Sequence, residues 1–280
     1  MVIDLPANAQ TAEYYLADLA TTKETVSPVV LASAAIGAVH KFHRFSNPAE
    51  NQSIQCLLQG VKNLYGKAPI QRQPITKVIL RDLLRHWLTP SLQRGDLIDW
   101  RSARIESLLF HLSARWGDLS RLLIDHFQSS SKGLTIFFPK RKNDQTGRGH
   151  RVILARSSSP FCPIALTEAY FLQLGTSYRG FVVPRIRRIK GVCHVDGSKP
   201  ATYQSCRSEQ VAALSAVGLD PSAFGLHSGR IGSTVILRNA HFDMSAIARR
   251  VGWSPNSNTV LHYAQKATAE FEAMNKALEL

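Results

Sequence analysis

A histidine and an arginine lie three residues apart in the segment GLHSGRIGS, residues 225–233. If a helix begins at residue 227, as Gly225 just before it allows, the side chains of His227 and Arg230 share one face of that helix. An arginine forks onto the non-bridging oxygens of a phosphate, and a histidine donates or shuttles a proton beside it. The pair is a candidate phosphate site, and an exposed helix start is the alternative explanation.

Two further segments carry residues with the right chemistry for such a site. Arg115 precedes Asp118 by three residues in LSARWGDLSRLLIDHF (112–127), where it is either a second cation or half of a local surface ion pair. The segment 251–265 holds Gly252 and Trp253, a polar stretch and then Tyr263. Taken alone, Tyr263 fits a tyrosine half-buried on a helix.

The elements that must position these residues are mostly helical. Apolar residues recur at helical spacing in four early segments, 9–20, 27–43, 50–63 and 75–88. The stretch 89–100 holds Pro90 and Gly95 without a clear period, so we expect a linker there. Beyond it, LTIFF (134–138) and HRVILA (150–155) predict a β-hairpin with a long basic loop. Further helices are expected at 101–114, 163–174, 205–217, 227–239, 243–251 and 267–279. The fold class is therefore mainly α with a small antiparallel β-sheet, in two domains.

The charge points to a polyanionic partner. The 280 residues contain 34 Lys and Arg against 20 Asp and Glu, a formal net charge of +14, and a basic surface gains affinity for nucleic acid by releasing counterions. An anionic membrane surface is the rival partner, but no basic amphipathic helix is obvious. The hairpin window 132–156 carries seven basic residues and one acid. A second basic cluster comprises Arg179, Arg185, Arg187, Arg188, Lys190 and Lys199. A solvated face is the alternative for both.

Other classes of protein are disfavoured. No apolar run approaches the ~20 residues of a membrane span, and the first fifteen residues do not have the pattern of a secretory signal. The four cysteines, Cys56, Cys162, Cys193 and Cys206, form no metal-binding pattern and are expected to be reduced thiols of an intracellular protein.

The order of these motifs resembles the tyrosine recombinase (phage integrase) family. SARWGDLSRL is similar to that family's G-L-R-x-S-E-L box, with Arg115 at its arginine. KRKNDQTGRGHRVIL resembles a hairpin that reads S-K-T-D-Q-x-G-x-G, which places Lys142 at the catalytic lysine. HSGR matches the H-x-x-R box with His227 and Arg230. Trp253 takes a place held by His or Trp, and Tyr263 falls one residue later than the nucleophile of many members.

The resemblance implies a site-specific DNA recombinase or integrase of a mobile element. It cleaves and rejoins strands through a 3′-phosphotyrosyl intermediate formed by Tyr263, without metal or cofactor. Two arginines stabilise the phosphate, Lys142 protonates the leaving oxygen, and His227 takes a proton or positions the phosphate. Trp253 packs against the site. The hairpin residues expected to bind DNA are Lys140, Arg141, Arg148 and Arg151.

The implied organisation is a helical core-binding domain at 1–88, a linker at 89–100 and a catalytic domain with a C-terminal tail helix at 101–280. Double-stranded DNA is the partner, with a homo-oligomer, a tetramer, assembled on it and no membrane. Phe271, Met274 and Leu278 form an apolar stripe that docks on a neighbouring protomer or packs back on its own domain. Two other functions share these residues: a catalytically inactive DNA-binding protein, and strand relaxation like that of type IB topoisomerases.

Overall fold

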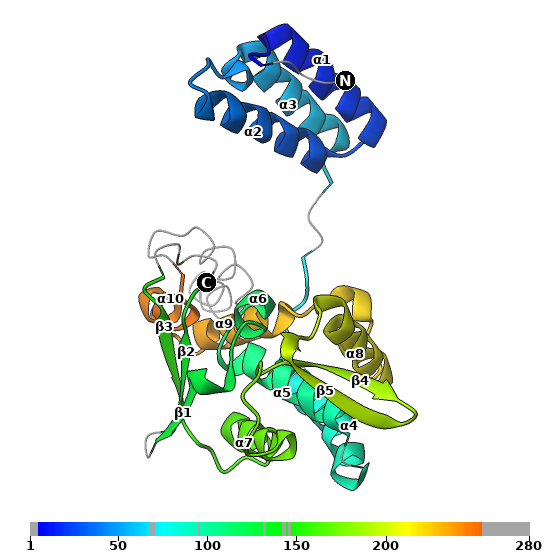
Figure 1. Cartoon of the computed structure of the whole chain (residues 1–280), viewed down its shortest axis with the longest axis vertical. Coiled ribbons are helices and arrows are strands. Elements are labelled where there is room, and N and C mark those ends of the chain that lie inside the picture. Colours follow the sequence, from blue (N-terminus) through cyan, green and yellow to red (C-terminus); the bar gives the residue numbers. More distant parts are fainter. Residues whose placement is uncertain are drawn as a thin grey trace, which may run out of the picture. The chain divides into compact units, whose positions relative to one another are not determined.

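The chain forms two compact units, Met1–Ile70 and Gln71–Leu280, drawn in Figure 1. The structure is a computed structural model, and it describes residues 5–67, 71–94, 96–130, 133–141, 144 and 147–253. The division between these units differs from the expected domain boundary. The division falls at residue 70, whereas the sequence suggested residue 88.

The first unit is built from three helices. They are α1 (Ala9–Lys23), α2 (Val26–Phe42) and α3 (Gln52–Tyr65), with a short 3-10 helix at Pro48–Glu50 before the third. The side chain of Asn8 caps α1 by accepting a hydrogen bond from the backbone N–H of Thr11 over 2.8 Å. The core of this unit is made of small and branched side chains, Ala12, Leu16, Ala20, Val29, Ile54 and Val61. The three helices expected in this part of the sequence are confirmed.

The linker expected at 89–100 is wrong. That stretch holds the end of α4 (Lys77–Arg94) and the start of α5 (Leu97–His111), and both helices belong to the second unit. Pro90 lies inside α4 and does not end it. A proline removes one backbone donor from a helix, and packing can outweigh that loss. The packing is visible in Leu83, Leu84 and Trp87 of α4, which are buried in one of the cores of this unit.

Helix α5 runs through the centre of the second unit. Its eleven consecutive residues from Trp100 to Phe110 are all buried, and it packs against α4, α7, α8 and α9. The buried stretch includes two arginines. Arg101 bonds the Pro184 carbonyl and the Glu209 carboxylate, and the Arg104 guanidinium lies 4.5 Å from the centre of the Tyr170 ring. Residues distant in the sequence provide partners for part of these charged side chains, which reduces the cost of burying them.

Two small antiparallel sheets flank this core (Figure 1). In the first, β1 (Phe127–Ser130), β2 (Gly133–Phe138) and β3 (His150–Leu154) lie in that order. Leu134 pairs with Leu154 and Phe138 with His150, which confirms the expected β2–β3 hairpin. The second sheet joins β4 (Pro184–Ile189) to β5 (Val192–Pro200) and was not expected.

Short and medium helices complete the second unit. They are α6 (Trp116–Leu119), α7 (Pro163–Leu174), α8 (Tyr203–Ala216), α9 (Ser228–Asn239) and α10 (Met244–Val251), with 3-10 turns at Ile124–His126 and Pro221–Ala223. The expected helices between 163 and 251 are confirmed to within two residues. The tail helix expected at 267–279 lies outside the described residues. No helix among those described is long and apolar enough to span a membrane.

Candidate active site

Four of the six expected catalytic residues belong to the described part of the chain. Arg115 directly precedes α6, His227 directly precedes α9, Arg230 lies in the first turn of α9, and Trp253 follows α10. The other two, Lys142 and Tyr263, lie outside the described residues.

Arg230 is the side chain that ties these segments together. It is fully buried, and its Nη1 donates to the Ser113 carbonyl over 2.6 Å and to the Val251 carbonyl over 3.4 Å. Its guanidinium also lies 5.0 Å from the centre of the Trp253 ring. The segment before Arg115, the first turn of α9 and the 251–253 turn therefore meet at one arginine.

Arg115 is placed by the sharp passage from α5 to α6. Ser113 adopts a left-handed φ of 48°, and Arg115 has extended backbone before the single turn of α6 begins. The side chain is half-buried. Its Nη1 is buried, and it makes no hydrogen bond within the part of the chain that the structure describes. A buried cationic donor of this kind is ready to receive an anion.

His227 is held neutral by its surroundings. Burial, then the positive charge of Arg230, then that of Arg115 lower the pKa of His227 to about 4, against a smaller opposite effect of Asp118. At neutral pH the imidazole therefore carries one ring proton and one free lone pair, so it can accept a proton as well as donate a hydrogen bond. The same effect shows that Arg115 and Arg230 both act on His227 electrostatically.

Asp118 forms a different ion pair from the local one that the sequence left open. Its Oδ2 accepts from Nε of Arg141 over 3.2 Å, and both side chains are almost fully buried. Arg141 was expected to bind DNA, and the structure shows that only 3% of it is exposed. The other three expected DNA contacts, Lys140, Arg148 and Arg151, are exposed on the same hairpin.

Both ends of the hairpin loop lie against the end of α10. Ring nitrogen Nε2 of His150, the first residue of β3, is 3.3 Å from the Arg250 carbonyl. Arg141, just after β2, lies against Gly252. Within the loop, Asp144 accepts hydrogen bonds from the backbone N–H groups of Arg148 and Gly149. The β2–β3 hairpin is thus anchored beside the segment that carries Trp253.

Two glycines of the HSGRIG segment serve packing. A Cβ on Gly229 would lie 3.2 Å from the Phe110 backbone nitrogen, and one on Gly232 would lie 1.8 Å from the Ile75 carbonyl oxygen. Helix α9 can approach α5 and the Ile75 backbone this closely only with glycine at these places. The tight packing fixes the direction in which His227 and Arg230 point.

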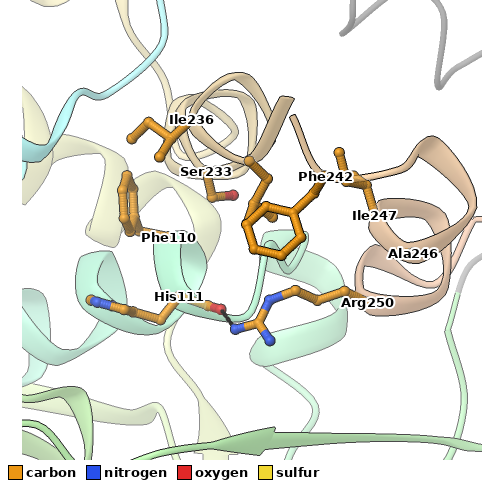
Figure 2. Close-up of a pocket in the computed structure, with 9 residues that line it drawn as sticks. Phe110, His111, Ser233, Ile236, Phe242, Ala246, Ile247 and Arg250 are labelled. Atoms are coloured by element: carbon orange, nitrogen blue, oxygen red, sulfur yellow. Dashed lines mark hydrogen bonds between the residues drawn. The ribbon is translucent and has the colours of Figure 1, made fainter. Parts of the chain in front are cut away.

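A separate apolar cavity of about 440 Å³ opens between α5, α9 and α10 (Figure 2). Its walls include Phe110, Ile236 and Phe242, and Arg250 closes one side by donating from Nη2 to the His111 carbonyl over 2.8 Å. No sequence pattern predicted this cavity, because its lining comes from α5, α9, α10 and the segment between the last two helices.

The described residues of the two units contain no cluster of side chains suited to hold a metal ion. No group of three or more His, Cys, Asp or Glu side chains is placed there to hold an ion. The charged groups of the site are instead guanidinium groups and one carboxylate, which suit an anionic ligand.

Comparison with known proteins places the fold. No model of a protein family matches the sequence, and no curated protein matches it. Solved structures, in contrast, do match this chain. The XerH site-specific recombinase bound to a palindromic difH substrate in a post-cleavage complex has a TM-score of 0.61 and 12% identity, over 96% of this chain and 72% of that one.

Two further structures agree. The Tn1549 transposon integrase (residues 82–397) with circular intermediate DNA has a TM-score of 0.57 and 15% identity, over 98% of this chain and 86% of that one. A λ integrase dimer bound to a COC′ core site has a TM-score of 0.56 and 11% identity, over 92% of this chain and 65% of that one. The chain has the fold of the tyrosine recombinases, which confirms the fold that the sequence resemblance implied.

Proposed function

We propose that this chain is a tyrosine-type DNA recombinase that cleaves and rejoins DNA strands through a 3′-phosphotyrosyl intermediate. One observation carries the proposal: Arg115, His227, Arg230 and Trp253, which come from three distant parts of the sequence, converge around buried cationic groups. The fold alone does not carry it, because one fold hosts many functions. A site that gathers two arginines and a neutral histidine is suited to a phosphodiester.

The proposed chemistry is an in-line displacement at phosphorus. The Tyr263 hydroxyl oxygen attacks, its proton passes to His227, and the bond from phosphorus to the 5′ oxygen breaks. Lys142 protonates that oxygen as it leaves, and attack by a 5′ hydroxyl reverses the step. Arg115 and Arg230 supply fixed positive charge to the pentacoordinate transition state. The phosphotyrosyl bond conserves the energy of the broken diester, so the cycle needs no nucleotide cofactor.

The proposed substrate is duplex DNA. The exposed residues Lys140, Arg148 and Arg151 present positive charge on the hairpin beside the site. The first unit is proposed to act as the core-binding domain. The similarity to the Tn1549 transposon integrase favours a role in integration or excision of a mobile element.

The proposed assembly is a homo-oligomer, a tetramer on two DNA sites. Its contact is the stripe of Phe271, Met274 and Leu278 from one copy, placed in the apolar cavity between α5, α9 and α10 of a neighbour. The cavity offers apolar walls of matching chemistry, and Phe242 at its edge is 53% exposed. Such an exchange would couple cleavage to assembly.

The test of catalysis compares two arginine substitutions. A duplex selected from a random pool by its binding to the chain is nicked, so that cleavage traps a covalent adduct. Arg115→Gln should abolish the adduct and leave duplex affinity within about threefold. Arg121→Gln is the matched control, because Arg121 is exposed and six residues further on. Duplex binding by the wild type with no adduct on any selected site would support the inactive DNA-binding protein instead.

A further inference from the structure

Arg141 occupies a position that the proposed chemistry does not use. It follows β2 by three residues, and only 3% of it is exposed. Nε donates to Oδ2 of Asp118 over 3.2 Å, and the guanidinium lies 4.5 Å from the centre of the Phe138 ring. The ion pair and the ring hold the guanidinium plane in one place.

A glycine also lies against the guanidinium of Arg141. Gly252 ends α10 in a left-handed conformation with φ of 69°, and a Cβ there would lie 2.4 Å from Nη1 of Arg141. The neighbours of Gly252 in the chain are the two residues that contact Arg230, Val251 through its carbonyl and Trp253 through its ring. Arg141 and Arg230 therefore lie against the same three-residue turn.

Arg141 is also joined to the segment that carries Arg115. Asp118 binds Arg141, and Ser113 binds Arg230, so Arg115 lies between the two anchoring residues in the sequence. Burial lowers the pKa of Arg141 against the opposite effect of Asp118, and the positive charge of Arg115 adds a smaller lowering, as it does for His227. Three arginines are thus held around one short segment.

The charge of this group is not balanced within it. Among the described residues of this group there are three guanidinium groups and one carboxylate, that of Asp118, which pairs with Arg141, while His227 is neutral. Nη1 and Nη2 of Arg141 are buried and make no hydrogen bond to any described residue, and the same is true of Nη1 of Arg115. Buried cationic donors without acceptors are costly. An anion whose oxygens reach these donors would remove that cost.

We propose that Arg141 is a third arginine of the phosphate site, held by Asp118 so that its two Nη groups bind the scissile phosphate together with Arg115 and Arg230. This inference rests on the proposed function of the site. It assigns Asp118 as a positioning residue, which fixes Arg141 through Nε and leaves the fork of Arg141 for the phosphate. The transition state carries more negative charge than the diester, so a third fixed cation favours it further.

The first test uses inorganic phosphate, which needs no knowledge of the DNA site. Phosphate binding is measured by calorimetry at pH 7 for the wild type, Arg141→Met, Arg141→Lys and Asp118→Asn, with Arg121→Gln as the control. Arg141→Met should weaken phosphate binding at least tenfold, and Asp118→Asn by a smaller factor. Arg141→Lys keeps the charge and the folding contacts but not the fork, so it should fall between the wild type and Arg141→Met.

The second test separates a charge role from a structural one. In a nicked duplex whose scissile phosphate is a methylphosphonate, one charged oxygen is replaced by an uncharged methyl group. Arg141→Met should lose about 100-fold in the rate of adduct formation on the phosphate duplex and much less on the methylphosphonate. Equal losses on both duplexes would overturn the proposal, because a structural defect does not depend on the charge of the substrate.

The outcomes also distinguish the two proposals. If Arg141→Met binds phosphate as the wild type does while Arg115→Gln does not, the role of Arg141 is wrong and the proposed function stands. If the wild type binds phosphate through Arg141 but forms no adduct, the phosphate site stands and the recombinase function fails. Should Arg141→Met fail to fold, Arg141→Lys decides, and phosphate binding at wild-type strength by that variant would contradict the need for a fork.

Discussion

Arg230 and Ser113 are 117 residues apart in the sequence, and Nη1 of Arg230 donates to the Ser113 carbonyl over 2.6 Å in the buried centre of the second unit. The bond joins the first turn of α9 to the passage between α5 and α6. It uses the backbone of the arginine segment, which leaves the side chain of Arg115 for another partner. The bond therefore holds the Arg230 side chain against the backbone segment that leads into Arg115, and such fixed positions favour catalysis by a preorganised site.

The neutral state of His227 has a consequence for stability in acid. The pKa of His227 in the folded chain is about 4, below the ordinary 6.5, so the unfolded chain takes up this proton first as the pH falls. Stability is therefore lost as the pH falls from 6.5 toward 4. His227→Gln should make the slope of unfolding free energy against pH smaller in that window by up to about 1.4 kcal/mol per pH unit.

Urea unfolding at pH 7, 6, 5 and 4.5 measures that slope. His194→Gln is the comparison variant, because it makes the same substitution at an exposed position on β5. His111 and His150 also have pKa values lowered by burial, so His227→Gln reduces the acid sensitivity without removing it. An unchanged slope in His227→Gln would mean that His227 is not held neutral.

Glu106 of α5 predicts the opposite dependence on pH. It is fully buried, accepts one hydrogen bond from Gln210 over 2.9 Å, and burial raises its pKa to about 7 from 4.5. The folded chain disfavours the ionised form, so stability falls as the pH rises from 4.5 through 7. Glu106→Gln should therefore stabilise the second unit at pH 8, on the order of 2–3 kcal/mol, and much less at pH 4.5.

Thermal or urea unfolding at the two pH values checks the effect of Glu106→Gln. Asp125→Asn, which changes an exposed carboxylate of the same unit, should show no such gain at pH 8. A Glu106→Gln variant that is less stable than the wild type at pH 8 would show that the carboxylate is needed in its ionised form.

Binding to duplex DNA should be strongly salt-dependent. If about 6–10 phosphates are contacted, affinity falls on the order of 10³–10⁵-fold between 50 and 200 mM salt. Arg148→Gln and Arg151→Gln should each reduce the slope of log affinity against log salt by about 1. The same slope measured for Arg179→Gln, in the second basic cluster, is the comparison. Fluorescence anisotropy at several salt concentrations gives the slopes, and a flat profile for the wild type would rule out a phosphate-binding surface.

The apolar cavity predicts how copies of the chain assemble on DNA. Phe242→Glu, at the cavity edge, and Phe271→Glu, on the tail stripe, should each remove higher-order complexes while single-site binding remains. Leu172→Glu is the control, because Leu172 is 72% exposed on α7 and outside the cavity. Sizing of complexes on one-site and two-site duplexes measures the effect. Full assembly by both variants would exclude the exchange, and loss of folding in Phe271→Glu would favour packing on its own domain.

Periodicity predicted most of the helices and the β2–β3 hairpin, but not the burial of α5. Its sequence, LIDWRSARIESLLFH, contains two arginines and a glutamate that would normally mark an exposed face. Arg101, for example, is buried where it donates hydrogen bonds to the Pro184 carbonyl and the Glu209 carboxylate. Those partners are distant in the sequence, so the burial could not be predicted from it. The β4–β5 hairpin was missed because PRIRRI was interpreted as a charge cluster. Its signal was the alternation of Arg and Ile, followed by Lys190 and Gly191, both with positive φ in a tight turn.

The candidate site also has residues that the sequence could predict and residues that it could not. The order of short motifs and the family resemblance that it carries selected Arg115, His227 and Arg230 as candidates, and the structure brings these residues together. The burial of Arg141 could not be predicted, since it depends on Asp118 in one element and on Gly252 in another. Gly252 ends α10 in a left-handed conformation, and its contact with the Arg141 guanidinium could not be predicted without the fold.

Covalent capture is the experiment that shows whether Tyr263 attacks a DNA phosphate. The wild type and Tyr263→Phe are each incubated with a selected, nicked duplex, the products are separated under denaturing conditions, and the DNA-linked peptide is identified by mass spectrometry. We expect an adduct at Tyr263 in the wild type, no adduct in Tyr263→Phe, and nearly equal duplex affinities for the two proteins. An adduct that persists in Tyr263→Phe, or one that maps to another residue, would contradict this expectation.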